Sequence, residues 1–143
     1  PVQGSGGYDS FVKDTSTVGN ATEGIVLAAL MRQGKSVLVP SGGGARYDLV
    51  VDEGGTFVRV QCKTGGLANG CGVFNTCSVS KSRQNVSYAG QVDLFGVYCP
   101  PLDTVYLVPA TLVEAKARCY LRVEALTYNR VKDVLWASDF EVK

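Results

Sequence analysis

The sequence predicts one α/β domain with a central mixed β-sheet flanked by helices, on three observations. An apolar stripe at helical spacing runs through residues 17–33, several short runs rich in Val, Leu and Phe follow it, and short helical stretches mix with strands from residue 109 onward. A chain of 143 residues can bury a core, and 45% hydrophobic and 19% charged residues exclude a disordered chain. Since no repeat or long linker interrupts the chain, we expect a single domain over residues 17–143.

Residues 1–16 are rich in Gly and polar side chains, which predicts a flexible arm. The helix predicted at residues 17–33 ends where Gly34 can adopt a left-handed conformation. A short strand at residues 36–40 leads into the glycine-rich loop 41–46, which lacks the Gly-x-x-x-x-Gly-Lys pattern of a nucleotide-binding loop. We therefore expect a hinge or an ordinary turn in this loop, and no nucleotide cofactor.

A β-hairpin is predicted at residues 47–63, where two apolar runs flank a Glu-Gly-Gly turn. In the second strand Cys62 falls on the face that can be buried, whereas Gln61 and Lys63 fall on the polar face. Asp48 begins the first strand and so places a carboxylate near that polar face. Carboxylate and amide oxygens suit Mg²⁺ or Mn²⁺, and a lysine ammonium can hold the attacking water or developing negative charge. This is the arrangement that a metal-dependent phosphodiesterase needs.

The pattern of Asp48 followed by Gln61-Cys62-Lys63 resembles the PD-(D/E)xK nuclease superfamily, with Tyr47 in place of the usual proline and Gln61 in place of the usual acid. It is most similar to the branch of homing endonucleases encoded in group I introns, in which glutamine is accepted at that position. The similarity extends from about residue 17 to the C terminus and includes residues 19–23, 39–40, 88–98, 105–109 and 121–124.

The resemblance implies a restriction-endonuclease-like core and a Mg²⁺- or Mn²⁺-dependent DNA endonuclease. Its catalytic residues would be Glu23, Asp48, Gln61 and Lys63. Asp48 and the backbone carbonyl of Cys62 would hold the cation together with Glu23 and Gln61, and Lys63 would orient water or neutralise charge in the transition state. Residue patterns alone leave a second role open for Glu23, because Asn20 and Glu23 also fit a helix capping box.

Further strands are expected at residues 71–80, 92–99, 104–108 and 119–124, and short helices at 109–117 and 131–137. The continuous hydrophobicity of residues 92–99 and 104–108 predicts central strands covered on both faces. Residues 64–72 are expected to form a glycine-rich turn and residues 81–91 a polar loop. Asp93 is expected to be satisfied by local backbone, since nothing beside it in sequence completes a second metal site.

The net charge of +1 does not by itself indicate binding to nucleic acid, but no Asp or Glu occurs from residue 54 to residue 92. The basic side chains of this stretch suit a phosphate backbone, and the amides of the loop 81–91 can contact base edges. We expect double-stranded DNA to be contacted by Arg46, Arg59, Lys81, Arg83, Gln84 and Asn85. The alternative is an ordinary solvated surface.

The five cysteines are odd in number and lie mostly among strand-forming residues, which predicts buried free thiols. Zinc and a histidine base are not expected, because the chain has no histidine and no Cys-x-x-Cys pair. No apolar run approaches the ~20 residues of a membrane span and no leader opens the sequence, so we expect no membrane partner and a cytoplasmic protein, at the nucleoid when bound to DNA.

A subunit with one active site cuts one strand at a time, so double-strand cleavage predicts a homodimer or homotetramer, and the resemblance favours the larger assembly. Two alternatives remain open at this point. The same core serves Holliday-junction-resolving and restriction-type nucleases, and the uncharged Gln61 is compatible with a catalytically inactive nuclease fold that only binds DNA.

Overall fold

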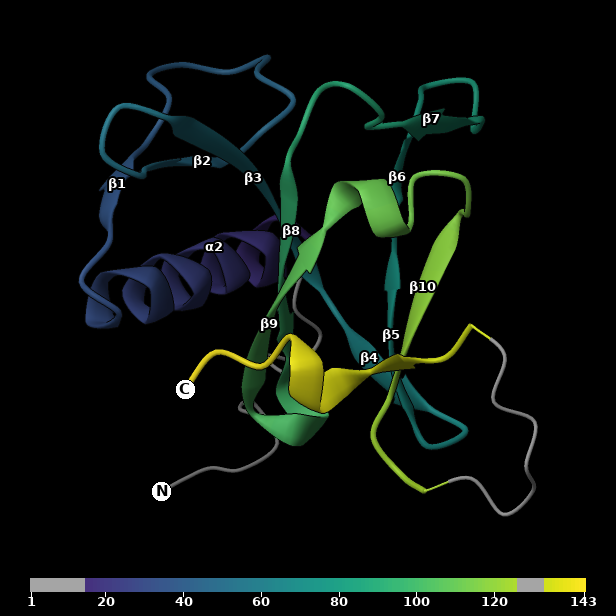
Figure 1. Ribbon diagram of the computed structural model, residues 1–143. Helices are drawn as coiled ribbons and strands as arrows, with labels where there is room; N and C mark the ends of the chain where they lie inside the picture. Colours follow the sequence, from purple (N-terminus) through teal and green to yellow (C-terminus); the bar gives the residue numbers. More distant parts are fainter. Residues whose placement is uncertain (1–14, 126–132) are drawn as a thin grey trace, which may run out of the picture.

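The computed structural model describes residues 15–125 and 133–143, in which one α-helix, α2 (Thr15–Arg32), packs against a five-stranded sheet (Figure 1). The strands of this sheet lie in the order β1-β2-β3-β8-β9. Only β3 and β8 are parallel, and the other neighbours are antiparallel, so the central mixed sheet predicted from the sequence is confirmed. The strands are β1 (Ser36–Leu38), β2 (Leu49–Asp52), β3 (Phe57–Thr64), β8 (Leu94–Cys99) and β9 (Thr104–Pro109).

A second, four-stranded sheet lies beside the first and has the strand order β11-β10-β5-β4 (Figure 1). It consists of β4 (Gly66–Ala68), β5 (Cys71–Asn75), β10 (Arg118–Arg122) and β11 (Leu135–Trp136). A separate hairpin, β6 (Cys77–Val79) and β7 (Asn85–Ser87), projects from the end of β5. The single strand expected at residues 71–80 is therefore wrong: it is interrupted at Thr76, whose N–H donates to Ala117 O at 3.0 Å and whose hydroxyl donates to Lys116 O.

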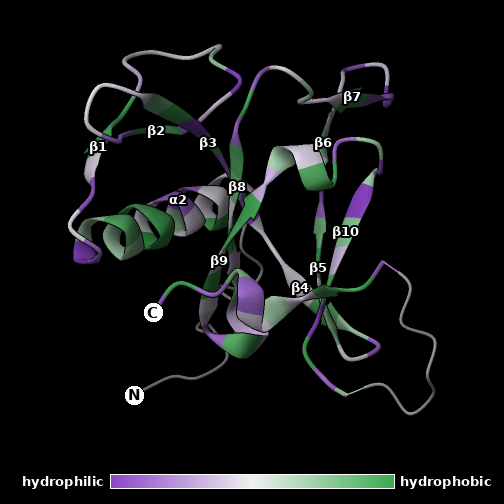
Figure 2. Cartoon of the chain, viewed as in Figure 1, coloured by the Kyte–Doolittle hydropathy of each residue, from purple (hydrophilic) through white to green (hydrophobic). Residues whose placement is uncertain are grey.

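The core has two parts, one on each face of the five-stranded sheet. Val26 and Leu30 of α2 pack on Val60 on one face, and Phe95 and Val108 pack toward the second sheet on the other. Hydrophobic residues accordingly continue along β8 and β9 (Figure 2). The prediction that these two strands are covered on both faces is confirmed, but the prediction that both are central is wrong for β9, which lies at the edge of the sheet.

The edge of the sheet at β9 is covered by the C-terminal residues. Leu107 N–H donates to Phe140 O and Val142 N–H donates to Val105 O, each at 2.9 Å. These bonds satisfy backbone groups that an open edge would leave exposed to another chain.

Several predicted elements differ from the structure. The predicted helix at 109–117 is wrong, because only a 3-10 turn η2 (Ala110–Leu112) forms there. The predicted helix at 131–137 is also wrong where it is described, because Leu135–Trp136 is strand β11, followed by η3 (Ala137–Asp139). Such short stretches are marginal helices in isolation, and pairing with β10 satisfies the backbone of β11 instead. The turn at 64–72 and the loop at 81–91 contain β4 and β7, respectively.

A further 3-10 turn, η1 (Pro100–Leu102), joins β8 to β9. The helix α2 starts at Thr15, two residues before the predicted start, so the last two residues assigned to the arm are helical. The remainder of that arm, residues 1–14, and residues 131–132 of the predicted last helix lie outside the described residues. Within the described part of the chain, no helix is long and apolar enough to cross a membrane.

Candidate active site

Two carboxylates from distant segments meet at the start of β2. Asp48 directly precedes β2; its N–H donates to Val60 O, and the N–H of Cys62 donates to its Oδ2, both at 2.9 Å. Glu23 lies on α2, and its pKa is raised above the ordinary value, first by partial burial and then by the charge of Asp48 and a hydrogen bond with it. Two ionised carboxylates this close repel each other unless a proton or a cation lies between them.

The helix α2 is held in the position that brings Glu23 to Asp48. Thr22 is almost fully buried, and its hydroxyl lies 2.6 Å from the hydroxyl of Thr64 at the end of β3. Because the helix begins at Thr15, both Asn20 and Glu23 lie inside it and have no free N-terminal N–H group to cap. The capping-box role considered for Glu23 is therefore wrong.

A cavity of about 180 Å³ opens beside the two carboxylates. The glycine-rich loop forms one wall, and Gly42 and Gly44 adopt φ values of +83° and +98°, which favour glycine. These two glycines and both carboxylates line the same cavity. The cavity is lined by Glu23, Val39, Pro40, residues 42–45, Tyr47 and Asp48.

The donor set at this point fits a hard divalent cation. Two carboxylates are present, and oxygens of Cys62 and Gln61 lie on the adjoining strand, where Gln61 Nε2 donates to Cys62 O at 3.3 Å. Burial, followed by the charges of Asp48 and Glu23, raises the pKa of the Cys62 thiol, which disfavours the thiolate form in the protein without a cation. No group of three or more His, Cys, Asp or Glu side chains suitable for a metal occurs among the described residues. Backbone and amide oxygens and water are the ligands that could add to the two carboxylates.

The ammonium of Lys63 is directed to the hairpin β6–β7. Its Nζ donates to the carbonyl of Cys77 at 3.1 Å and to the hydroxyl of Tyr88 at 3.3 Å. Among the described residues it forms no ion pair with Glu23 or Asp48. The structure thus brings the two carboxylates and β3 together as predicted, and it adds a partner for the lysine that the sequence analysis did not identify. In the sequence, Tyr88 is an aromatic residue in an otherwise polar stretch, and it begins the segment 88–98 that resembles the family.

The predicted DNA-contacting residues fall into two groups. Lys81, Arg83, Gln84 and Asn85 are all exposed at and beside the turn that joins β6 to β7. Arg46 instead lies against the hairpin, where its guanidinium donates to Gln91 Oε1, Ser78 Oγ and the carbonyl oxygens of Val86 and Ser87 at 2.7–3.5 Å.

Arg59 is also bound to protein groups. Its Nε and Nη2 each lie 3.1 Å from the carboxylate of Asp93, and its Nη1 donates to Gly90 O. The hydrogen bond from the Arg59 side chain is the main reason that the pKa of Asp93 is lowered. The expectation that local backbone satisfies Asp93 is wrong, because its partner is 34 residues away on β3.

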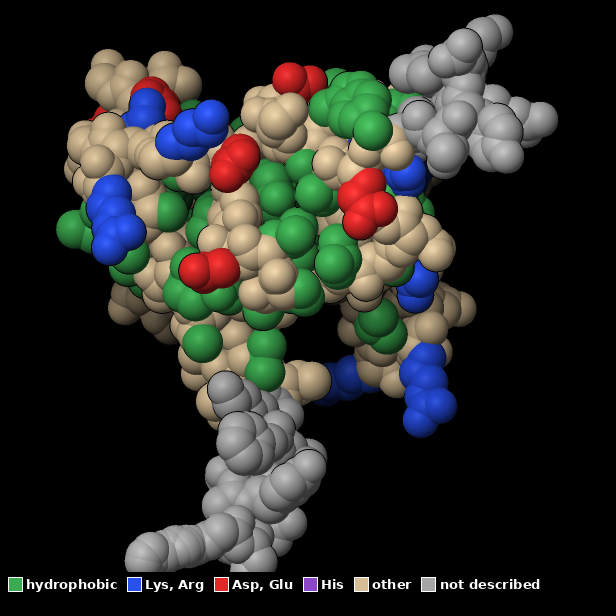
Figure 3. Space-filling view, turned by 90° about the horizontal axis from the view of Figure 1, so that it is seen from below, with side chains coloured by type: hydrophobic (Ala, Val, Ile, Leu, Met, Phe, Trp, Pro, Cys, Tyr) green, Lys and Arg blue, Asp and Glu red, His purple; other side chains and the backbone are tan. Residues whose placement is uncertain are grey.

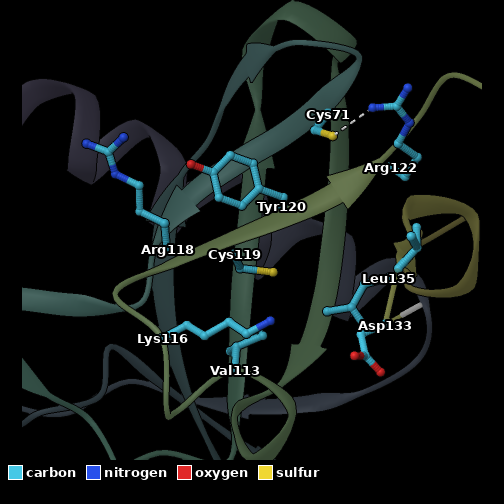
Figure 4. A pocket seen from close by; sticks show the side chains of 10 residues that line it. Cys71, Val113, Lys116, Arg118, Cys119, Tyr120, Arg122, Asp133 and Leu135 are labelled. Atoms are coloured by element: carbon cyan, nitrogen blue, oxygen red, sulfur yellow. Dashed lines mark hydrogen bonds between the residues drawn. The ribbon is translucent and has the colours of Figure 1, made fainter. Parts of the chain in front are cut away.

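A second cavity, of about 300 Å³, lies along β10 of the four-stranded sheet (Figure 4). Its lining includes Lys116, Arg118 and Arg122, and Asp133 is the one carboxylate. This excess of positive charge does not suit a metal ion. The cysteines are all free thiols, with Cys62, Cys71, Cys99 and Cys119 buried, so that prediction is confirmed.

The fold and the carboxylate pair define a nuclease-type core, and the sequence comparison is consistent with this. The sequence model of the PD-(D/E)XK endonuclease family matches residues 13–143, so the chain belongs to that family. The structure is similar to that of a bacterial homing endonuclease, I-Ssp6803I, with a TM-score of 0.72 and 22% sequence identity, covering 90% of this chain and 89% of the other. At this identity the likeness shows a shared fold. No curated protein matches the chain.

The superfamily and the restriction-endonuclease-like α/β fold predicted from the sequence are thereby confirmed. Membership of the homing endonuclease branch stays a prediction.

Proposed function

We propose that the protein is a metal-dependent DNA endonuclease of the homing type, which hydrolyses phosphodiester bonds. The observation that carries this proposal is the pairing of Glu23 with Asp48 beside β3, in a chain of the PD-(D/E)XK endonuclease family. Two carboxylates held together from separate elements repel each other and so destabilise the protein without a cation. Such a cost to stability is typical of a functional site, and a cation bound between the carboxylates would remove the repulsion. An enzyme of this kind would work in the cytoplasm, at the nucleoid.

Each residue of the site has a distinct role in this proposal. Asp48, Glu23, the carbonyl of Cys62 and the amide oxygen of Gln61 would hold Mg²⁺ or Mn²⁺. The bound cation would supply Lewis acidity toward the scissile phosphate and lower the pKa of a bound water. Lys63 would donate a hydrogen bond to the attacking water or to the phosphate oxygens as negative charge develops on them. Gln61 brings no charge, so fewer negative ligands balance the cation than in a site with a third acid.

The hairpin β6–β7 is the proposed DNA-contacting element. Its exposed side chains can contact phosphates or base edges without breaking an ion pair among the described residues. These side chains are Lys81, Arg83, Gln84 and Asn85. Arg46 and Arg59 would contact DNA only after they release their present acceptors. We therefore assign the first contacts to the hairpin and secondary contacts to these two arginines.

A homodimer or homotetramer is proposed because a single active site cuts one strand. The face seen from below carries hydrophobic side chains that gather between separate acidic and basic ones, which supports self-association (Figure 3). Over the described residues as a whole, exposed large hydrophobic side chains include Met31 at 60% and Val39 at 62%, and Val39 lines the cavity beside the carboxylates. Light scattering should show more than one copy at micromolar concentration, and a monomer both with and without DNA would refute this assembly.

The test of the proposed function is cleavage of DNA selected from a random library, with Mg²⁺ added or chelated. Lys63→Met should lower the cleavage rate about a hundredfold while affinity in chelator stays the same, since it removes charge needed in the transition state. Asp48→Asn should also lower cleavage, with partial recovery at raised Mg²⁺ and equal or tighter binding in chelator, since it removes a carboxylate near phosphates.

The outcomes separate the rival functions. If both variants cut as fast as the parent protein, the site is not catalytic. Tight binding with no cleavage in either Mg²⁺ or Mn²⁺ would indicate a DNA-binding module. A strong preference for four-way junctions over duplex would indicate a junction-resolving enzyme, and the selected sequence would distinguish homing from restriction-type cleavage by its length.

A further inference from the structure

We propose that Tyr88 is a positioning residue that holds the ammonium of Lys63 in place for catalysis. This inference rests on the proposed nuclease function and adds to it a residue outside the predicted site. Tyr88 directly follows β7, and only 5% of its surface is exposed. Among the described residues, it is the one buried side chain whose hydroxyl accepts a hydrogen bond from Lys63.

The contacts of the ammonium leave it little freedom. Lys63 Nζ donates to the hydroxyl oxygen of Tyr88 at 3.3 Å and to the carbonyl oxygen of Cys77 at 3.1 Å, and it lies 4.8 Å from the centroid of the Tyr88 ring. A lysine ammonium has three N–H donors. Two are used by these oxygens, so one is left for a water or a phosphate oxygen, in a direction that the other two determine.

The ring of Tyr88 is itself fixed on two sides. Phe95 of β8 contacts it edge-on, with centroids 5.8 Å apart and an interplanar angle of 82°. The guanidinium carbon of Arg46 lies 4.0 Å from the centre of the same ring. Because Arg46 also donates to Ser78 Oγ and Ser87 O, its own position is set by the hairpin. The hydroxyl therefore cannot swing away from Lys63 without breaking this packing.

The hairpin β6–β7 carries both an acceptor of the Lys63 hydrogen bonds and the proposed DNA contacts. Cys77, which accepts a hydrogen bond from Lys63, belongs to β6, and the proposed DNA contacts lie at and beside the turn at the far end of that strand. Engagement of DNA by the turn is thus connected to the position of the lysine through one short strand. Of the two oxygens that accept hydrogen bonds from Lys63, the carbonyl of Cys77 belongs to the backbone, whereas the hydroxyl of Tyr88 belongs to a side chain. A single substitution can therefore remove the hydroxyl.

The test is Tyr88→Phe, which keeps the ring against Phe95 and Arg46 and removes the hydroxyl alone. The single-turnover cleavage rate in Mg²⁺ should fall about tenfold, the scale of one hydrogen bond to a charged group. Affinity for the same DNA in chelator should stay within about twofold, since the ring and the hairpin are retained. The matched control is Tyr98→Phe, which removes another hydroxyl hydrogen bond, to Asp103 at 2.9 Å. Neither residue lines the cavity beside the carboxylates or contacts Lys63 Nζ, so this variant should leave cleavage unchanged.

A double-mutant cycle with Lys63→Met shows whether Tyr88 acts through the lysine. Tyr88→Phe should cause no further loss in the Lys63→Met background, because the group that it positions is already absent. All rates are measured well below each variant's melting temperature, so that a loss of stability cannot be mistaken for a loss of positioning.

The failures are distinguishable. If the parent protein cuts no DNA, the proposed function fails before Tyr88 is tested. If the parent cuts and Tyr88→Phe cuts equally fast or faster, the hydroxyl does not position the lysine for catalysis. An equal further loss in the Lys63→Met background, or a loss confined to DNA affinity, would likewise overturn the proposal.

Discussion

Replacement of Gly96 by alanine should displace α2 from the sheet and with it the carboxylate of Glu23. Gly96 lies in β8, where a Cβ atom would be 2.7 Å from Val26 Cγ1 and 3.1 Å from Val60 Cγ1. Carbon atoms in contact are ~3.5–4.0 Å apart, so Val26 has to move by roughly 1 Å. Both valines have 0% exposed surface, so neither can relieve the overlap by turning into solvent.

The magnitude follows from that overlap. Overpacking of a well-filled core costs about 1–3 kcal/mol. In a domain of this size each kcal/mol lowers the melting temperature by roughly 3–4 °C, so Gly96→Ala should melt about 3–12 °C below the parent protein. Glu23 lies about one helical turn from Val26, so cleavage should fall even at temperatures where the variant is fully folded.

The assay is thermal unfolding followed by circular dichroism, with Mg²⁺-dependent cleavage measured on the same preparation. Gly66→Ala is the matched control, because Gly66 is also in a strand and no heavy atom lies within 4 Å of its added Cβ. This control should melt at or slightly above the parent's temperature, since alanine restricts the unfolded chain. If Gly96→Ala melts within a degree of Gly66→Ala and cuts as fast, the close contact of α2 with β8 is incorrect.

Three further predictions concern charge. In chelator at pH 7, Glu23→Gln should raise the melting temperature, because burial and Asp48 raise the pKa of Glu23 and so disfavour its ionised form. The gain in melting temperature should shrink as the pH falls and Glu23 of the parent protein takes up a proton. A gain that is the same at every pH would contradict this cause. Asp93→Asn should lose roughly 0.5–1 kcal/mol in urea unfolding at pH 7. Because Arg59 lowers the pKa of Asp93, that stability is present above the unfolded value and is lost as the pH falls through the folded one; a loss that persists at low pH would show that the ion pair is not its source. The third variant is Arg83→Asn, chosen because Asn tolerates the φ of 62° found at this position. If Arg83 contacts a phosphate, the variant should bind DNA more weakly, and the slope of log affinity against log salt concentration should fall by about one. Unchanged affinity and slope would place the turn away from DNA.

The elements that the sequence predicted well have their cause in local geometry. Side chains alternate along a strand, so the burial of Val60 and Cys62 and the partial exposure of Gln61 and Lys63 could be deduced from the pattern of β3 alone. The helix α2 was predicted to within two residues at each end because its apolar stripe spans several turns. Short stretches such as residues 109–117 carry no comparable pattern, and packing determined their structure instead.

The second sheet was missed because its strands pair over long distances in sequence. Cys71 of β5 is paired with Arg122 of β10, and Arg122 with Trp136 of β11. Nothing in three to five consecutive residues specifies such a partner. The interruption at Thr76 likewise depends on acceptors at Lys116 and Ala117, which only the folded chain brings near.

The sequence by itself determined the candidate site residues of this hairpin, since Asp48, Gln61 and Lys63 follow from strand alternation and from the hairpin's spacing. Only the tertiary structure decided how they are paired. The packing of α2 on β8 places Glu23 beside Asp48, and the return of the chain after β7 places Tyr88 on Lys63. The physical reason is that alternation within a strand is a property of the local backbone, whereas each of these contacts joins elements whose relative position is set by burial of the whole core.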